Sequence, residues 1–228
     1  MAERPASFPP AVLFDLDGTL LDSAPDFVAT LASLATATGL PAPTAGQIRP
    51  VVSKGSRAML AAAFPQLAEA AREALVPVFL DTYQGLIGQH AVLFDGVAAM
   101  LDALDAAGSR WGIVTNKPEY LARDILPQHG WQQRCAVLVG GDTLAQKKPH
   151  PLPLLHAAEA IGVAPAHCVY VGDDERDIIA ARAAGMPAVA ALWGYRLDSE
   201  DPVAWGAQVL HDSPHPLSQW QGWPATAA

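Results

Sequence analysis

Cysteine is scarce in this chain, and the shortage limits what the protein can do. Only two of the 228 residues are cysteines, Cys135 and Cys168, which is too few to form a zinc site on their own. Both lie in or beside apolar, strand-like runs, so we expect buried thiols. Such thiols are typical of a reducing compartment, and the sequence therefore predicts a cytoplasmic protein.

Basic residues are also in short supply. The chain has 14 Lys and Arg against 23 Asp and Glu, which gives a net charge of −9. Nucleic-acid backbones are bound by basic stripes, so we expect no nucleic-acid partner. A small anionic substrate remains compatible with this charge, because a few lysines and a metal ion can reverse the field locally.

Long apolar runs are absent as well. No run is long enough to cross a bilayer, and residues 1–10 lack the apolar region of a signal peptide. The length suffices for a good core, either as one large domain or as a core with an insertion. We expect a globular protein away from the membrane, with monomer and homodimer both open.

The order of predicted elements divides the chain into two kinds of structure. Residues 23–87, here called the helical block, predict only helices, near 24–38, 44–52, 55–64 and 67–85. Pro77 is expected to kink or break the last of these. Outside the block, strands at 11–14, 111–115, 136–139, 167–171, 188–192 and 208–210 alternate with helices at 95–107, 119–129, 152–161 and 174–184. This alternation predicts an α/β fold with a doubly wound parallel sheet, followed by a short helix with a loose end after residue 214.

An acidic pair follows the first predicted strand. Asp15 and Asp17 stand two positions apart at the end of the sheet, where extended geometry points both side chains the same way. Two carboxylates this close repel each other unless a cation lies between them, and a hard divalent ion bound through oxygen is the simplest one. Gly18 allows the tight turn that follows. Alone, the pair could also be two acidic turn residues.

Polar residues follow three later strands, at the edge where doubly wound sheets bind ligands. The hydroxyl of Thr115 can donate to a phosphoryl oxygen, although alone it could equally be a strand residue before a helix cap. Lys148 is a compact cation in a proline-rich loop, where a solvated surface lysine is the alternative. Asp173 and Asp177 flank a predicted helix start, at which Asp174 and Glu175 are expected to act as caps.

Together, these motifs resemble those of the haloacid dehalogenase superfamily of phosphotransferases. The segment from Phe14 to Leu20, Thr115, the Lys148 loop and the stretch from Gly172 to Asp177 run in the superfamily's order. The pattern K-P-x-P-x-P after Lys147 is similar to that of its phosphoglycolate phosphatase-like branch. The resemblance implies a Rossmann-like core of residues 1–22 and 88–228, with residues 23–87 as a small inserted helical cap.

The resemblance also implies a mechanism. Asp15 would attack phosphorus and form an aspartyl-phosphate, and Asp17 would protonate the leaving alcohol and then activate water. Dehalogenases of the superfamily lack a carboxylate at the position of Asp17, which favours phosphate-ester chemistry. The cofactor implied is Mg²⁺, held by Asp15, Asp173 and the backbone carbonyl of Asp17, with Asp177 supporting the site from behind. The implied phosphate-binding residues are Thr115, Asn116, Lys148 and, through backbone N–H groups, Gly18.

Substrate choice is expected to come mainly from the helical block. Lys54 and Arg57 could meet a substrate carboxylate, although a loop of solvated basic residues is equally compatible, and Lys117 is a further possible substrate contact. Five segments, residues 53–59, 114–118, 171–174, 194–195 and 205–207, resemble those of the bacterial N-acetylmuramic acid 6-phosphate phosphatases of peptidoglycan recycling. That resemblance implies a carboxylate-bearing phosphorylated substrate, with 2-phosphoglycolate as the alternative. Two alternatives belong to other functional classes: a phosphomutase on the same core, and a non-catalytic phosphosugar-binding protein.

Overall fold

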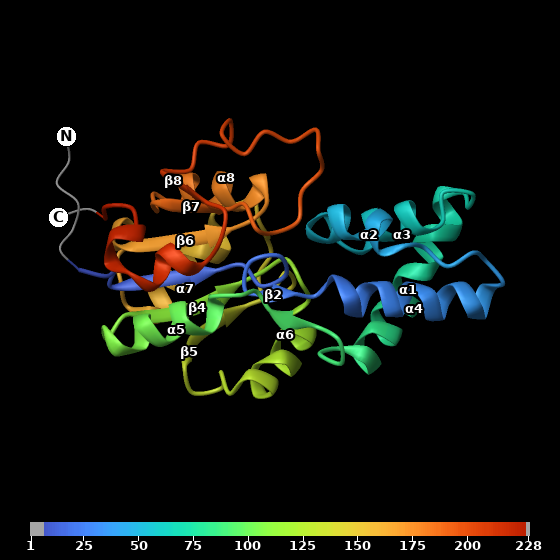
Figure 1. Cartoon of the computed structure of the whole chain (residues 1–228), viewed down its shortest axis with the longest axis horizontal. Coiled ribbons are helices and arrows are strands. Elements are labelled where there is room, and N and C mark those ends of the chain that lie inside the picture. Colours follow the sequence, from blue (N-terminus) through green and yellow to red (C-terminus); the bar gives the residue numbers. More distant parts are fainter. Residues whose placement is uncertain (1–6, 227–228) are drawn as a thin grey trace.

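A parallel sheet forms the centre of the molecule. The computed structural model describes residues 7–226, and its six-stranded sheet has the order β5-β4-β1-β6-β7-β8 (Figure 1). All strand pairs in this sheet are parallel. The strands are β1 (Ala11–Phe14), β4 (Arg110–Val114), β5 (Cys135–Val139), β6 (Cys168–Gly172), β7 (Ala188–Ala191) and β8 (Val209–His211). The doubly wound parallel sheet predicted from the alternating pattern is confirmed.

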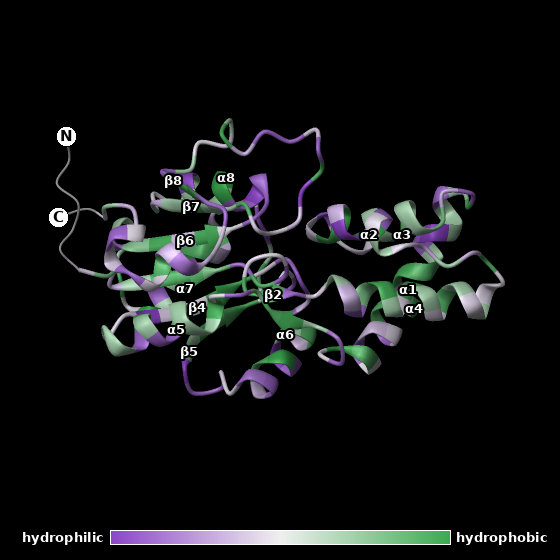
Figure 2. Cartoon of the chain, viewed as in Figure 1, coloured by the Kyte–Doolittle hydropathy of each residue, from purple (hydrophilic) through white to green (hydrophobic). Residues whose placement is uncertain are grey.

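Helices cover both faces of the sheet. Alternate strand residues point to opposite faces, so Phe14 and Ile113 join one apolar cluster while Leu13 and Tyr170 join the other. The first cluster lies against α5 (Val97–Ala106) and α6 (Glu119–Ile125), and the second against α7 (Leu152–Ile161) and α8 (Glu175–Ala183). Figure 2 shows the central strands as largely hydrophobic. Because β1, β6 and β7 are buried on both sides, their sequences are continuous apolar runs.

Short 3₁₀ turns complete this part of the chain. They are η2 (Leu126–His129), η3 (Pro165–His167), η4 (His215–Ser218) and η5 (Trp220–Gly222). The prediction of a short helix with a loose end after residue 214 is only partly right. Two 3₁₀ turns form there, and Leu217 and Trp223 are buried in the α5 face of the core. Burial of these two apolar side chains holds the segment after residue 214 against the core.

The helical block has an apolar core of its own. It contains α1 (Ala24–Thr38), α2 (Ala45–Ile48), η1 (Arg49–Lys54), α3 (Ser56–Ala63) and α4 (Glu69–Leu86). Phe27, Phe79 and Tyr83 stack in this core, with Phe27 and Tyr83 only 4.3 Å apart between ring centroids. Figure 1 shows these helices to one side of the sheet, next to the loop that follows β1. This places the helical block over the strand ends that carry the predicted site.

Two expectations for the helical block are corrected. The sequence predicts a kink or a break at Pro77; the helix α4 runs through this residue without interruption, so the break is wrong. Stacking of Phe79 and Tyr83 against Phe27 of α1 holds the second half of α4 in place. The single helix expected over residues 44–52 is instead a short α-helix, with a capping box between Thr44 and Gln47, followed by the 3₁₀ turn η1.

A two-stranded ribbon joins the helical block to the sheet. The strands β2 (Leu21–Asp22) and β3 (Val92–Leu93) are antiparallel, and the sequence did not predict either. Two residues are too few to display the period of a strand. Beside the ribbon, the buried carboxylate of Asp26 accepts hydrogen bonds from the N–H groups of Gly88 (2.6 Å), His90 (2.7 Å) and Ala91 (3.2 Å). The two connections of the helical block are therefore tied together.

Candidate active site

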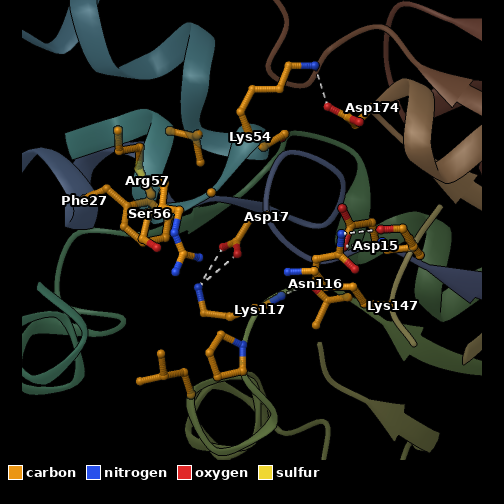
Figure 3. A pocket seen from close by; sticks show the side chains of 18 of the residues that line it. Asp15, Asp17, Phe27, Lys54, Ser56, Arg57, Asn116, Lys117, Lys147 and Asp174 are labelled. Atoms are coloured by element: carbon orange, nitrogen blue, oxygen red, sulfur yellow. Dashed lines mark hydrogen bonds and ion pairs between the residues drawn. The ribbon is translucent and has the colours of Figure 1, made fainter. Parts of the chain in front are cut away.

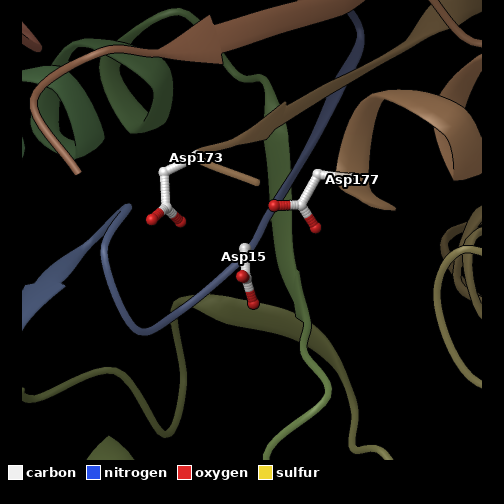
Figure 4. Close-up of side chains that lie close together, drawn as sticks. All are labelled: Asp15, Asp173 and Asp177. Atoms are coloured by element: carbon white, nitrogen blue, oxygen red, sulfur yellow. The ribbon is translucent and has the colours of Figure 1, made fainter. Parts of the chain in front are cut away.

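Three buried carboxylates meet at the carboxyl edge of the sheet. Asp15 follows β1, Asp173 follows β6, and Asp177 lies in the first turn of α8 (Figure 4). One oxygen from each lies within 4.8 Å of the others, and the residues are only 8%, 2% and 1% exposed. Burial, together with the charges of Asp15 and Asp177, raises the pKa of Asp173 well above its ordinary value. Burial also raises the pKa of Asp177 to about 6, although Lys148 opposes the shift.

Lys148 provides a buried cation for this cluster. Its Nζ lies 3.0 Å from Oδ1 of Asp15 and 2.7 Å from Oδ1 of Asp177. Burial works to lower the pKa of Lys148, but the two carboxylates outweigh it, and the net shift is upward. The ammonium also donates to the hydroxyl of Tyr170 at 2.7 Å, and that hydroxyl donates to the carbonyl of Val114 at 2.7 Å. Tyr170 is not among the predicted site residues, and its signal in the sequence is a lone hydroxyl within an otherwise apolar strand.

The donor set suits a divalent cation. One lysine, paired with Asp15 and Asp177, accompanies three buried carboxylates, so the carboxylates of the cluster outnumber its cation. Oxygen ligands are those preferred by hard cations such as Mg²⁺. Gly18 and Gly194 bring the backbone close to Asp173, since a Cβ at these positions would lie 2.1 Å from its Oδ2 and 2.3 Å from its Cβ, respectively. These glycines thus leave space around Asp173 that any other residue would fill.

Of the three residues predicted to bind the metal ion, only Asp15 and Asp173 bring their side chains into one cluster. The cluster consists of Asp15, Asp173 and Asp177. The side chain of Asp17 lies apart from it, paired with Lys117, while Asp177 lies inside it. The resemblance implies that Asp17 binds the metal ion through its backbone carbonyl and that Asp177 supports the metal ligands without binding the ion.

Asp17 and Lys117 form a pair at the boundary with the helical block (Figure 3). The Nζ of Lys117 donates to both carboxylate oxygens of Asp17 at 3.0 Å and to the hydroxyl of Tyr83 at 2.7 Å. It also lies over the rings of Phe27 and Tyr83, 4.8 and 4.4 Å from their centroids. Because the sequence places these residues on separate elements, this contact was not predictable from local pattern.

The residues predicted to bind phosphate lie along the same edge. Thr115 is 4% exposed, and its Oγ1 accepts a hydrogen bond from the N–H of Lys117 at 3.2 Å. Asn116 donates from Nδ2 to the carbonyl of Lys148 at 2.9 Å, which ties the two loops together. The N–H of Gly18 donates to the carbonyl of Leu21 at 2.9 Å, so it is used within the loop. Thr115, Asn116 and Lys148 line one cavity with Asp15 and Asp17.

The predicted cap residues make contacts of different kinds. Lys54 pairs with Asp174 at 2.6 Å and also with Glu200, whereas Arg57 is an exposed residue that pairs with Glu73 at 2.7 Å. Burial works to raise the pKa of Asp174, but Arg176 and Lys54 outweigh it and hold the value at about 2. As expected, Asp174 is also the N-cap of α8.

Ser53 is a contact that the sequence analysis did not single out. Its hydroxyl donates to Oδ2 of Asp173 at 2.7 Å, and its carbonyl accepts a hydrogen bond from Arg176. The N–H of Tyr195 donates to the same Asp173 oxygen at 2.9 Å. The helical block therefore reaches the acidic cluster directly through η1.

A cavity of about 540 Å³ lies between the helical block and the sheet edge. At the sheet edge it is lined by the charged residues Asp15, Asp17, Lys117, Lys148 and Asp177. Its other wall is apolar and comes mostly from the helical block, with the side chains of Phe27, Met59, Val76, Phe79, Leu80 and Leu121. Within the part of the chain described by the structure, no helix is long and apolar enough to span a membrane.

Comparison with known proteins gives the family. The sequence profile of the haloacid dehalogenase-like hydrolases matches residues 12–191, which contain all four motifs. The chain belongs to this family. The phosphoglycolate phosphatase of Xanthomonas campestris pv. campestris (strain 8004) is 68% identical over 217 residues, or 95% of this chain and 98% of the relative.

Other relatives support the same family. The N-acetylmuramic acid 6-phosphate phosphatase of Pseudomonas aeruginosa is 43% identical over 208 residues, covering 91% of this chain and 92% of the relative. The crystal structure of a predicted phosphoglycolate phosphatase from Haemophilus somnus 129PT superposes with a TM-score of 0.82 at 26% identity, covering 93% of this chain and 98% of that one. This haloacid dehalogenase-like hydrolase is therefore a phosphatase.

Proposed function

We propose that this phosphatase hydrolyses a phosphomonoester through an aspartyl-phosphate on Asp15, with Mg²⁺ as cofactor. The observation that carries the proposal is the carboxylate of Asp15, buried beside the Lys148 ammonium and two further carboxylates at the floor of the cavity. A carboxylate in contact with a lysine and facing a cavity is placed to attack a bound phosphoryl group.

The proposed reaction has two steps. An oxygen of Asp15 forms a bond to phosphorus while the bond from phosphorus to the leaving alcohol breaks, and Asp17 gives that alcohol a proton. Asp17 then takes a proton from water, whose oxygen attacks phosphorus and releases phosphate and free Asp15. Lys148, Thr115 and Asn116 would orient the phosphoryl oxygens. Mg²⁺, held by Asp15, Asp173 and the backbone carbonyl of Asp17 with Asp177 behind, would shield the approach of one anion to another.

We propose N-acetylmuramic acid 6-phosphate as the substrate and residues 23–87 as the cap that selects it. A cavity of about 540 Å³ with an apolar wall suits a substituted hexose better than a two-carbon acid. The relative from Pseudomonas aeruginosa carries this activity in its name. We also propose a cytoplasmic location, supported by the two free thiols, whose pKa values burial raises to about 11.

The alternative substrate is 2-phosphoglycolate. The relatives at 68% and 60% identity are named phosphoglycolate phosphatase. Both candidate substrates bear a carboxylate, so the charge of the cavity alone does not separate them.

The experiment compares phosphate release from the two esters with Mg²⁺ and with EDTA. We expect N-acetylmuramic acid 6-phosphate to be preferred about a hundredfold in kcat/KM, which corresponds to roughly 2.7 kcal/mol of differential transition-state binding. Asp15→Asn should lower kcat more than about a thousandfold while Asp198→Asn, an exposed control, leaves it unchanged. Substantial turnover by Asp15→Asn would refute the nucleophile assignment, and a reversed preference would refute the sugar-acid substrate.

A further inference from the structure

Lys117 is a buried cation that the proposed mechanism does not use. Its side chain is only 4% exposed, although it lines the cavity. The ammonium has three polar contacts: both oxygens of Asp17 and the hydroxyl of Tyr83. An ammonium has three N–H donors, so these contacts satisfy it completely.

The surroundings of Lys117 demand an anion. The rings of Phe27 and Tyr83 lie against the ammonium, where they take the place of water. An unpaired charge in such a place is costly, so a carboxylate has to accompany it. Among the residues that the structure describes, Asp17 is the one carboxylate within ion-pair distance of Lys117.

This ion pair conflicts with the proposed role of Asp17 as the residue that protonates the leaving alcohol. Both of its oxygens are engaged by Lys117 at 3.0 Å, whereas Asp17 has to reach the leaving oxygen of the substrate. If Asp17 turned away without a replacement, the ammonium would be left alone between two aromatic rings. A second anion is therefore needed at Lys117 at the moment Asp17 is used.

Three other cations that line the cavity, Lys54, Lys148 and Arg57, do not need an incoming anion in the proposed reaction. Lys54 keeps Asp174 and Glu200 as partners, and Lys148 keeps Asp177 when Asp15 reacts. Arg57 has a side chain that is 69% exposed, and it pairs with Glu73. An ion pair at such a surface position contributes little.

We propose that Lys117 is the receptor for a carboxylate on the leaving group of the substrate, and that this carboxylate displaces Asp17 from Lys117. The inference rests on the proposed function of Asp17. The exchange replaces one anion on Lys117 by another, so the buried ammonium is never unpaired, and the released carboxylate of Asp17 takes up a proton from solvent, which it then gives to the leaving alcohol. An ester without the second anion leaves Asp17 held by Lys117. The substrate class is accordingly a phosphomonoester whose alcohol carries a carboxylate.

Two matched pairs of esters test this inference without deciding which substrate is physiological. N-acetylmuramic acid 6-phosphate is compared with N-acetylglucosamine 6-phosphate, and 2-phosphoglycolate with 2-hydroxyethyl phosphate. In each pair, only the first member carries a carboxylate. For the better-hydrolysed pair, we expect the wild-type protein to favour the acid by at least ~20-fold in kcat/KM.

The variants are chosen to separate carboxylate binding from mere positioning of Asp17. Lys117→Met should bring the ratio within each pair close to one, whereas Lys117→Arg should keep most of the preference. If Lys117 only positioned Asp17, its replacement would lower kcat/KM equally for both esters of a pair. Lys147→Met removes an exposed lysine that lines the same cavity and should retain the preference.

Binding of the free sugars to the wild-type protein tests the inference without relying on turnover or on the stability of a variant. Calorimetric titration of the wild-type protein with N-acetylmuramic acid and with N-acetylglucosamine should show clearly tighter binding of the acid. Thermal unfolding of Lys117→Met shows whether that variant is folded before its kinetics are compared.

Three outcomes would overturn the inference: equal rates within each pair for the wild type, a preference that survives Lys117→Met, or a preference lost equally in Lys147→Met. Absence of metal-dependent phosphate release from every ester would instead contradict the proposed function. In that case the binding titration still decides whether this protein recognises the carboxylate.

Discussion

A single hydroxyl organises the buried charges at the sheet edge. Tyr170 lies on β6, accepts a hydrogen bond from Lys148 and donates one to the carbonyl of Val114 on β4. Lys148 is thereby held between Asp15 and Asp177 rather than free to rotate. The position of the ammonium depends on a residue that does not itself face the cavity.

Replacing Tyr170 by Phe tests this dependence. The change leaves a buried donor of Lys148 and the carbonyl of Val114 without their partner, so we expect a loss of about 1–3 kcal/mol in the free energy of unfolding. Activity should fall mainly through kcat, because the lysine is less well placed. Chemical denaturation and steady-state kinetics measure both effects. Tyr120→Phe, on the exposed face of α6, is the matched control and should change neither. Wild-type stability and kcat in Tyr170→Phe would contradict this account.

For individual residues, the sequence predicts which side chains lie at the carboxyl edge of the sheet. It does not predict which side chains they contact there. Asp15, Thr115 and Asp173 follow buried strands, and parallel strands end at a common edge, so their meeting is foreseeable. The contacts of Ser53 with Asp173 and of Lys117 with Tyr83 join elements that only tertiary packing brings together. No local pattern encodes them.

The helix α4 shows how packing overrides a local preference. Proline removes a helical hydrogen bond and crowds the preceding turn, yet α4 continues for 18 residues through Pro77. Its two aromatic residues beyond Pro77 stack on Phe27, and this burial offsets the defect. The buried strands were predictable because their runs are wholly apolar, whereas the two-residue β2 and β3 carry no such signal.

Pro77→Ala should therefore stabilise the protein. Pro77 is exposed, so the change restores a backbone hydrogen bond without opening a cavity. We expect a gain of about 1–2 kcal/mol in the free energy of unfolding and a rise in Tm of roughly 2–8 °C. Thermal unfolding by circular dichroism measures it, with the exposed α4 variant Asp81→Ala as control, expected within about 0.5 kcal/mol of wild type. A lower Tm for Pro77→Ala would show that the proline conformation is itself required.

On the scale of the whole molecule, the charge balance is uneven. The chain has a net charge of −9, and three of its carboxylates are concentrated in one buried cluster. Like charges at such distances destabilise the folded state. A divalent cation that binds the cluster should stabilise the whole fold, since it binds the folded protein more tightly than the unfolded chain.

Titration with Mg²⁺ should accordingly raise Tm. At about a hundred times its dissociation constant, a ligand adds roughly 2.7 kcal/mol to stability. Differential scanning fluorimetry with MgCl₂, against NaCl of equal ionic strength, measures the shift, and EDTA should reverse it. Asp173→Asn should reduce the response to Mg²⁺, while Asp198→Asn should keep it. An equal response in Asp173→Asn would place the ion elsewhere.

The pairing of Asp22 with Val92 has a consequence for how such a protein can diversify. Since the chain leaves and re-enters the core at neighbouring points, everything between them is encoded by one continuous piece of gene. A recombination event confined to that piece would exchange the wall of the cavity that the helical block forms, including Ser53 and its contact with Asp173, and would keep the three carboxylates of the cluster. Asp26 and the N–H groups that it binds, those of Gly88 and His90, all lie within the exchanged piece, so this contact between its two ends would be kept. On the proposed function, such an exchange would keep the phosphoryl chemistry and change which alcohols the cavity accepts.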